Sequence, residues 1–269
     1  MKKIFLFLFV YLLHLSALEL DINVGSGLYY ASADGKLIYK KEFWRNSSAE
    51  IRHETDTRAY IWADITTDIE HFPKIFLELS QHKTEGKSFI HIEAGTALNQ
   101  ILAAIENNLF LNINNTNYES RLVQNTYEGF AYYEYFEDMD LPTLGFGLGV
   151  KKFDFDYSAV IIDGLTFNDN GGGVAPMLFF KSRYELEKNR DGTLLSIEGD
   201  AKIYLFGDSD IYDYLLKMDF LMSYNERTEL GFELGYRKVY YNIKGTDIVN
   251  VGGEMSSSGV YFGLVAHFR

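Results

Sequence analysis

Residues 228–241 read TELGFELGYRKVYY, and apolar and polar side chains alternate one by one along this stretch. One face of an extended chain would carry Leu230, Phe232, Leu234 and Tyr236. The other face would carry Glu229, Gly231, Glu233, Gly235 and Arg237. A period of two over this length predicts a β-strand with two chemically different sides.

The same alternation extends outward from this stretch over most of the chain. The preceding residues 213–225 repeat it, with Leu216, Met218 and Phe220 opposite Lys217 and Asp219. It is weaker at 57–67, 74–83 and 125–136. In chain order the expected strands lie near residues 20–30, 57–67, 74–83, 125–136, 143–155, 176–187, 193–206, 213–225, 228–241 and 260–268. The sequence therefore predicts an all-β fold of about ten strands.

The connectors between these strands alternate in length. Short connectors are expected at 68–73, 137–142, 188–192 and 225–227. Long ones are expected at 33–56, 84–124, 156–174, 207–212 and 243–257. Short turns at one end and long loops at the other are typical of a transmembrane antiparallel up-and-down β-barrel. A soluble periplasmic β-sandwich would also alternate, but the several charges on the polar faces and the aromatic residues near strand ends favour the barrel.

The longest connector breaks the period of two. Leu98, Ile101, Leu102, Ile105 and Leu109 follow helical spacing after Thr96, a suitable N-cap, which predicts a short amphipathic helix over 96–110 in an extracellular loop. Alternatively, 88–94 and 107–114 are two extra strands, giving twelve; eight is the lower alternative.

The N-terminus has the three parts of a secretory signal peptide. Lys2 and Lys3 precede the apolar run Ile4–Leu13, and Leu15-Ser16-Ala17 offers a small residue at the cleavage site. We therefore expect a signal peptide at 1–17, cleaved after about Ala17, and one barrel domain at 18–269. No later stretch reaches the ~20 apolar residues of a spanning helix.

Composition excludes several classes of protein. The 269 residues contain no Cys, which excludes disulfides, cysteine-bound metals and a lipid-anchored N-terminal cysteine. The formal net charge is −13, from 25 Lys and Arg against 38 Asp and Glu. Such a chain repels nucleic-acid phosphates, so no nucleic-acid partner is expected.

Several motifs are similar to those of a family of predicted, functionally uncharacterised proteobacterial outer-membrane β-barrel proteins. The matching stretches are 59–64 with His71-Phe72-Pro73, Tyr132-Tyr133 through Asp138 to 144–148, 174–179, Leu234-Gly235-Tyr236-Arg237, and 259–263 running to His267-Phe268. The resemblance implies a barrel in the outer membrane of a Gram-negative bacterium and brings no catalytic residues with it.

Two sets of residues are candidates for function. The charged residues on the polar faces are expected to fill the lumen as mutually paired ions: Lys151, Lys181, Arg183, Glu185, Glu198, Asp200, Lys202, Lys217, Asp219, Glu233 and Arg237. The last strand is expected to serve barrel assembly through Val260, Phe262, Leu264, Ala266 and Phe268.

These features predict a porin-like membrane protein with a structural envelope role or a narrow channel, not an enzyme. The alternatives are a lipid or peptide hydrolase and a surface-binding or adhesion module that acts through the extracellular loops. For a hydrolase, the best histidines are His82 and His91, near Glu85 and Glu93, without a nucleophile motif. We expect no cofactor and no metal. The expected partners are outer-membrane lipid or lipopolysaccharide, the barrel-assembly machinery and, as an open option, a small solute.

Overall fold

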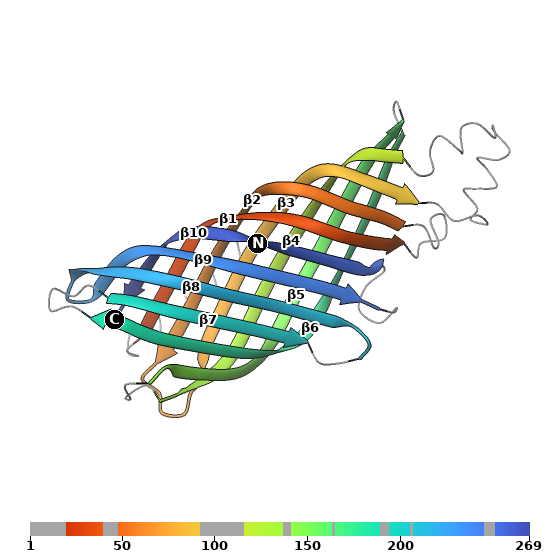
Figure 1. Cartoon of the computed structure of the whole chain (residues 1–269). Coiled ribbons are helices and arrows are strands. Elements are labelled where there is room, and N and C mark those ends of the chain that lie inside the picture. Colours follow the sequence, from red (N-terminus) through yellow and green to blue (C-terminus); the bar gives the residue numbers. More distant parts are fainter. Residues whose placement is uncertain are drawn as a thin grey trace, which may run out of the picture.

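The computed structural model describes residues 20–39, 48–91, 116–136, 141–162, 165–188, 194–204, 207–244 and 251–269. Within these residues the chain forms ten β-strands that close into a barrel (Figure 1). They are β1 (Leu20–Tyr39), β2 (Ser48–Thr67), β3 (Lys74–His91), β4 (Thr116–Tyr135), β5 (Thr143–Ile162), β6 (Leu165–Lys188), β7 (Leu194–Tyr204), β8 (Asp210–Asn225), β9 (Thr228–Ile243) and β10 (Val251–Phe268). The predicted all-β antiparallel barrel is confirmed.

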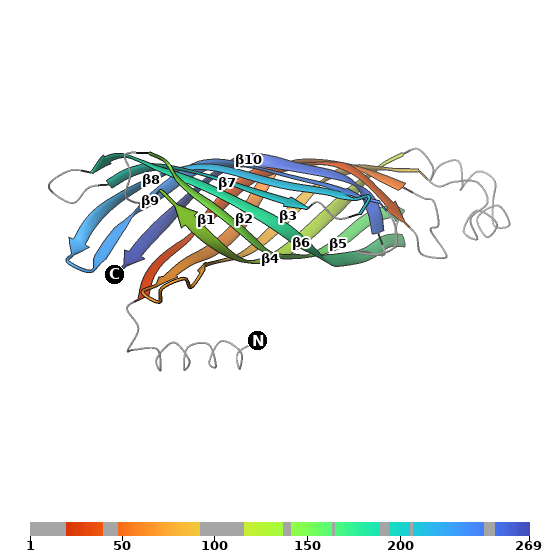
Figure 2. The same ribbon diagram turned by 90° about the horizontal axis from the view of Figure 1, so that it is seen from below.

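Each strand pairs antiparallel with its neighbours in the chain, and β1 pairs with β10 to close the ring. In this closing pair Tyr30 lies opposite Val260, and Gly27 lies opposite Gly263. The strands tilt around the barrel in Figure 2. The closed ring pairs each strand with two neighbours. β6 extends past β7, and in the described part of the chain its residues 165–177 pair with β5 alone.

The two ends of the barrel differ in their connectors. At the end that we call the turn end, residues 68–73, 136–142, 189–193 and 226–227 link the strands, and the last strand finishes there (Figure 1). At the other end, the loop end, the intervals are residues 40–47, 92–115, 163–164, 205–209 and 244–250.

The prediction of a long connector at 156–174 is wrong. β5 continues to Ile162 and β6 begins at Leu165, so only two residues separate them. The connectors expected at 33–56, 84–124 and 243–257 are likewise shortened by strand residues at both ends. These strand residues were assigned to connectors because many of their outward side chains are polar, so apolar and polar residues do not alternate along them. The helix expected at 96–110 lies outside the described residues.

A continuous apolar band covers the outer surface of the turn-end half. Its members are exposed although they are large and apolar: Leu28, Leu77, Leu79, Phe146, Leu148, Val150, Leu216, Met218, Phe232, Leu234, Phe262 and Leu264. Tyrosines accompany the band, including Tyr30, Tyr127, Tyr133, Tyr184, Tyr214 and Tyr236. No helix in the described part of the chain has the length and apolar character needed to cross a bilayer.

Beyond this band, the loop-end parts of strands β2 to β6 form a segment that we call the extension, residues 48–53, 83–91, 116–123, 155–162 and 165–171. Its exposed outward face is mostly polar, with Val160 beside the charged residues Arg52, Lys83, Glu85, Lys87, Glu119 and Arg121. Its inward face is buried and uncharged or aromatic, with Ile51, His53, Thr84, Ser88, Ser120, Leu122, Phe155 and Tyr157. The extension therefore has the polarity of an ordinary water-soluble β-structure.

Candidate functional site: an ion-paired lumen

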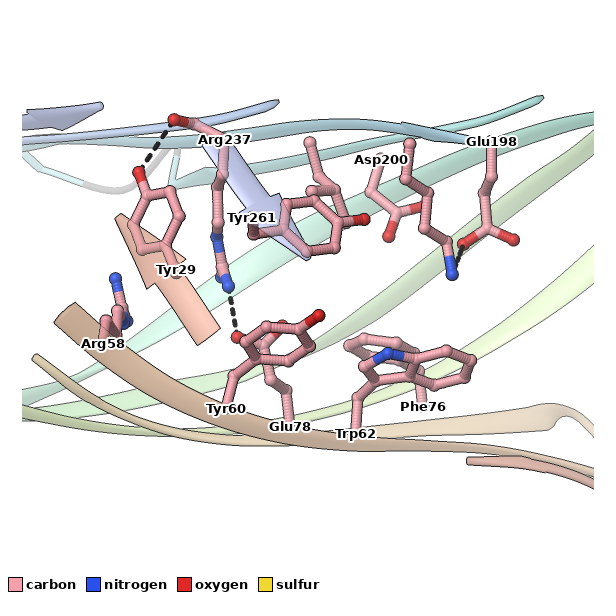
Figure 3. A pocket seen from close by; sticks show the side chains of 12 residues that line it. Tyr29, Arg58, Tyr60, Trp62, Phe76, Glu78, Glu198, Asp200, Arg237 and Tyr261 are labelled. Atoms are coloured by element: carbon pink, nitrogen blue, oxygen red, sulfur yellow. Dashed lines mark hydrogen bonds and ion pairs between the residues drawn. The ribbon is translucent and has the colours of Figure 1, made fainter. Parts of the chain in front are cut away.

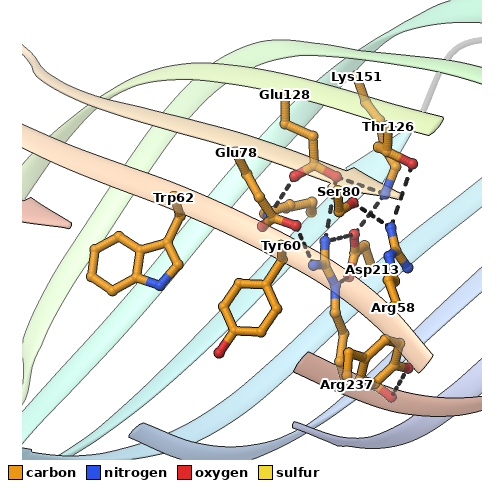
Figure 4. A network of polar contacts seen from close by, with 12 residues as sticks. Arg58, Tyr60, Trp62, Glu78, Ser80, Thr126, Glu128, Lys151, Asp213 and Arg237 are labelled. Atoms are coloured by element: carbon orange, nitrogen blue, oxygen red, sulfur yellow. Dashed lines mark hydrogen bonds and ion pairs between the residues drawn. The ribbon is translucent and has the colours of Figure 1, made fainter. Parts of the chain in front are cut away.

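Six charged side chains meet across the lumen and form what we call the central network (Figure 4). Its cations are Lys151 on β5, Lys202 on β7 and Arg237 on β9. Its anions are Glu78 on β3, Glu128 on β4 and Asp213 on β8. All six are nearly inaccessible to solvent. Because three cations face three anions, the central network is formally neutral.

The geometry of the central network is that of strong, charge-assisted hydrogen bonds. Arg237 donates two hydrogen bonds to Asp213, from Nε to Oδ1 at 2.8 Å and from Nη2 to Oδ2 at 2.6 Å. Its Nη1 donates to Glu78. Lys202 Nζ lies 2.5 Å from Glu128 Oε2 and 3.2 Å from Glu78 Oε2. Lys151 Nζ lies 2.6 Å from Asp213 Oδ2. These contacts join β7 and β9 to β3 and β4 on the opposite wall.

A second group of charges, which we call the turn-end network, lies closer to the turn end. It comprises Asp64, Lys181, Arg183, Glu198, Asp200, Lys217, Asp219 and Glu233. Lys181 Nζ lies 2.6 Å from Asp64 Oδ2 and 3.3 Å from Glu198 Oε2. Lys217 Nζ lies 3.1 Å from Glu198 Oε1 and 3.4 Å from carboxylate oxygens of Asp219 and Glu233. Five acids face three cations, so this group carries an excess of negative charge.

Aromatic side chains fill the space between the ion pairs and supply additional donors. Tyr60 Oη and Trp62 Nε1 donate to the same oxygen of Glu233 at 2.8 and 3.0 Å. They reach it across two glycines: a Cβ on Gly25 would lie 2.3 Å from Trp62 Nε1, and one on Gly263 would lie 2.3 Å from Tyr60 Oη. The missing side chains therefore allow both rings to lie flat across the lumen.

Cations also lie over aromatic rings. Lys217 Nζ is 4.1 Å from the centre of the Trp62 ring, and Lys202 Nζ is 4.8 Å from that of Phe76. Phe76 in turn stacks on Phe179 at 5.6 Å, and Phe179 on Phe130 at 4.8 Å. Favourable cation–π contacts partly replace the water that these ammonium groups lose on burial.

Most of the charged residues expected in the lumen lie there. Lys151, Lys181, Glu198, Asp200, Lys202, Lys217, Asp219, Glu233 and Arg237 are buried, and Arg183 is partly buried. Glu185 differs: it is exposed and stands outside both networks, because it lies near the turn end of β6 beside an irregularity in the pairing with β7.

Four lumenal acids and one cation were not among the predicted lumenal residues. They are Asp64, Glu78, Glu128, Asp213 and Arg58. Most lie on β2 to β4, where the alternation was weakest. The signal available was the single acid between two outward apolar residues, as in Leu77-Glu78-Leu79.

The closing strand β10 directs the predicted assembly residues outward. Val260, Phe262, Leu264 and Phe268 are exposed, and Ala266 is partly exposed. Arg269, which follows the terminal Phe, donates its backbone N–H to the carbonyl oxygen of Arg227 at 2.9 Å. The last residue is thereby tied to the β8–β9 turn.

The histidines suggested for a hydrolase do not come together with their acids. His82 is buried and faces the lumen, whereas Glu85 is exposed on the outer face. The side chain of His91 and all of Glu93 lie outside the described set. The histidine that does contact hydroxyls is His53, with Nδ1 2.8 Å from Thr84 Oγ1 and Nε2 2.7 Å from Ser120 Oγ.

An internal cavity lies beside the two networks, lined by residues of β1 to β3 and β7 to β10 (Figure 3). Tyr29, Tyr60, Trp62, Phe76 and Tyr261 form its aromatic wall. The centres of water-sized molecules can occupy about 20 Å³ of it. One water needs about 10–15 Å³ of volume open to its centre, so the cavity has room for one or two waters or an ion of similar size.

Comparisons with known proteins agree with the barrel fold. No family model matches the chain, and no curated protein sequence matches it. Among solved structures, the outer membrane protease OmpT from Escherichia coli is similar with a TM-score of 0.52 at 10% identity, over 92% of this chain and 96% of that one. The translocator domain of the autotransporter NalP from Neisseria meningitidis gives a TM-score of 0.38 at 10% identity, over 93% and 88% of the two chains. At this identity the likeness extends to the fold: the chain has the fold of outer-membrane β-barrels.

Proposed function

We propose that the protein is an integral outer-membrane β-barrel with a closed lumen and a structural role in the envelope. The observation that carries this proposal is the set of ion pairs that joins opposite walls. Arg237 and Lys202 bridge β9 and β7 to Glu78 on β3 and Glu128 on β4. A solute in transit would have to displace these pairs and leave buried charges without partners, which costs several kcal/mol for each ion, about 3–5 kcal/mol when one partner is removed.

The outer surface supports the membrane location. The apolar band with its accompanying tyrosines is what lipid requires of a barrel exterior. In this proposal residues 1–17 direct export, the barrel-assembly machinery recognises the terminal strand, and lipid or lipopolysaccharide surrounds the band. The mature protein should fractionate with the outer membrane and migrate differently in detergent gels before and after boiling. Recovery from the soluble periplasmic fraction would contradict the proposal.

The geometry favours a closed barrel over a hydrolase. Among the described residues at the loop end, no histidine forms an ion pair with a carboxylate, and His53 contacts hydroxyls on both ring nitrogens. A general base oriented by an acid, as hydrolases commonly use, is therefore not assembled there. Incubation of the refolded barrel with phospholipid and peptide substrates should give no turnover.

Planar-bilayer conductance tests the closed lumen directly. Wild-type protein should conduct little, and Arg237→Ala should open a leak because it removes the side chain that links β9 to β3 and β8. Lys238→Ala is the matched control, since Lys238 is the next residue and is exposed on the outer face. A large, steady conductance of the wild type that Arg237→Ala leaves unchanged would refute the closed lumen and identify a channel.

A further inference from the structure

Arg58 on β2 is a buried cation without the carboxylate partners that Lys151, Lys202 and Arg237 have. Its side chain is among the largest fully buried ones, with 1% of the residue exposed. Nη2 donates to Ser80 Oγ at 2.5 Å and reaches Thr126 Oγ1 at 3.5 Å. Nε and Nη1 are buried and have no hydrogen-bond partner among the described residues. Two nitrogens of a guanidinium are thus left without an acceptor.

The charges around Arg58 leave it uncompensated. In the described part of the chain, no carboxylate oxygen lies within the 4.0 Å of an ion pair with it, and its neighbours Ser80 and Thr126 are uncharged. The adjacent central network is already neutral, with three cations and three anions, and Asp200 of the turn-end network lies at the other end of the same cavity (Figure 3). The Tyr29 ring, 5.6 Å from the guanidinium carbon, is the other favourable contact that the structure gives it. A charge buried in this way is strongly unfavourable without a counter-charge.

Arg58 also lines the internal cavity, at the end away from Asp200 (Figure 3). The cavity has room for an occupant of about the size of water, which excludes a sugar, a peptide or a lipid headgroup. At its far end the two carboxylate oxygens of Asp200 have no hydrogen-bond partner among the described residues. Since Asp200 repels a negative ion, an anion in this cavity would be held at the Arg58 end.

We propose that Arg58 is the centre of a binding site for one small inorganic monovalent anion inside the lumen. The anion accepts hydrogen bonds from Nε and Nη1 and compensates the local positive charge of the guanidinium. Ser80 and Thr126 hold the guanidinium in place through Nη2. The site gives the Arg58 guanidinium, through a diffusible ion, the acceptor that its surroundings lack, which deepens the proposed closed barrel but does not depend on its location in the membrane.

The first test uses bromide as the probe, with the refolded mature barrel in detergent. Crystals grown or soaked in sodium bromide should show an anomalous peak within hydrogen-bond distance of the Arg58 guanidinium. Absence of this peak, with the cavity occupied by water alone, would overturn the proposal. Peaks confined to exposed lysines and arginines would identify surface ions and would likewise count against it.

The second test measures the unfolding temperature in sodium bromide and in sodium gluconate of equal ionic strength, since gluconate is too large for the cavity. We expect bromide to raise the wild-type unfolding temperature by about 2–4 °C. Arg58→Gln should abolish this difference. Arg52→Gln is the control, since Arg52 lies six residues earlier on the same strand and its side chain is 80% exposed, so the difference should remain. Equal bromide stabilisation of wild type and Arg58→Gln would refute the site.

Discussion

The turn-end half of the barrel and the extension are built from the same strands with opposite polarity. Around the apolar band, outward side chains such as Leu234 are apolar and inward ones such as Glu233 are charged. In the extension, outward side chains such as Arg121 are charged, and inward ones such as Leu122 are apolar or uncharged. The two regions therefore differ in which face is apolar, while strand geometry is the same in both.

The two regions also close their interiors by different chemistry. The turn-end half uses charged groups, whose burial is favourable only when every ion keeps its partner. The extension uses hydroxyls, one histidine and aromatic rings, where a lost contact leaves only a neutral group without a partner. We therefore expect the two regions to respond very differently to similar substitutions.

The largest effect should come from breaking the central network. Asp213→Asn removes the acid shared by Arg237 and Lys151, so two buried cations each lose one of their acidic partners. The free energy of unfolding should fall by about 3–5 kcal/mol. Asp154→Asn is the control, because Asp154 pairs with Lys152 on the outer face, where the loss should stay below about 1 kcal/mol. Denaturant titration in lipid vesicles measures the free energy of unfolding of both variants. Equal losses would contradict the claim that the lumenal ion pairs stabilise the barrel more than the outer ones.

A charge on the apolar band should have the next largest effect. Leu234→Arg places a cation on the outer face of β9 and should lower the free energy of unfolding by about 2–4 kcal/mol if lipid surrounds the band. The reverse exchange on the extension, Arg121→Leu, should change it by less than about 1 kcal/mol. Cysteine labelling from the lipid phase should modify position 234 and spare position 233. The opposite labelling pattern would mean that the register is wrong.

Within the extension, a lost hydroxyl should cost less than a lost ion. Ser120→Ala removes the group that contacts His53 Nε2 at 2.7 Å and Ser88 Oγ at 2.7 Å. The free energy of unfolding should fall by about 1–3 kcal/mol, since buried polar atoms then lack a partner. Ser158→Ala on the outer face of β5 is the control, with an expected change within about 0.5 kcal/mol. A loss for Ser120→Ala as large as that for Asp213→Asn would remove the contrast between the regions.

The smallest effect should be a pH dependence that belongs to the extension. Burial lowers the pKa of His53, although Asp34 and Glu85 act in the opposite direction. Below about pH 6.5 the unfolded chain takes up a proton at this histidine while the folded chain does not, so stability should decrease as the pH falls through that value. His53→Gln should reduce this decrease, measured as unfolding free energy above and below that pH. An unchanged pH dependence in the variant would show that His53 is not the group responsible.

The barrel and most of its lumenal cations could be predicted because alternation is a local property of the sequence. Leu230 to Arg237 carry all the information needed to assign their two faces. The outer segments of β5 and β6 were mistaken for a loop because their outward residues, such as Asp156 and Asn170, are polar. Hydropathy then no longer separates the two faces.

The partners of the lumenal ions could not be predicted because they depend on closure of the ring. Alternation predicts that the charges share the lumen, and Lys217 does pair with Glu198 on the neighbouring strand. Lys202, however, finds Glu78 124 residues earlier in the chain, across the lumen. That proximity is set by the strand number and stagger of the whole barrel, which no single strand reveals.

The seam between β1 and β10 has a consequence for how the barrel forms. While the sheet is open, Lys202, Arg237, Glu78 and Glu128 lie on one continuous water-facing surface and remain hydrated. Their desolvation and their pairing coincide when the first and last strands meet, because only then do opposite walls face each other. Closure is therefore the step at which the charged surface loses its water, and it joins the two most distant strands of the chain. We expect the ring to form as one late, all-or-none event, with an open sheet whose inner face stays soluble until the seam is made.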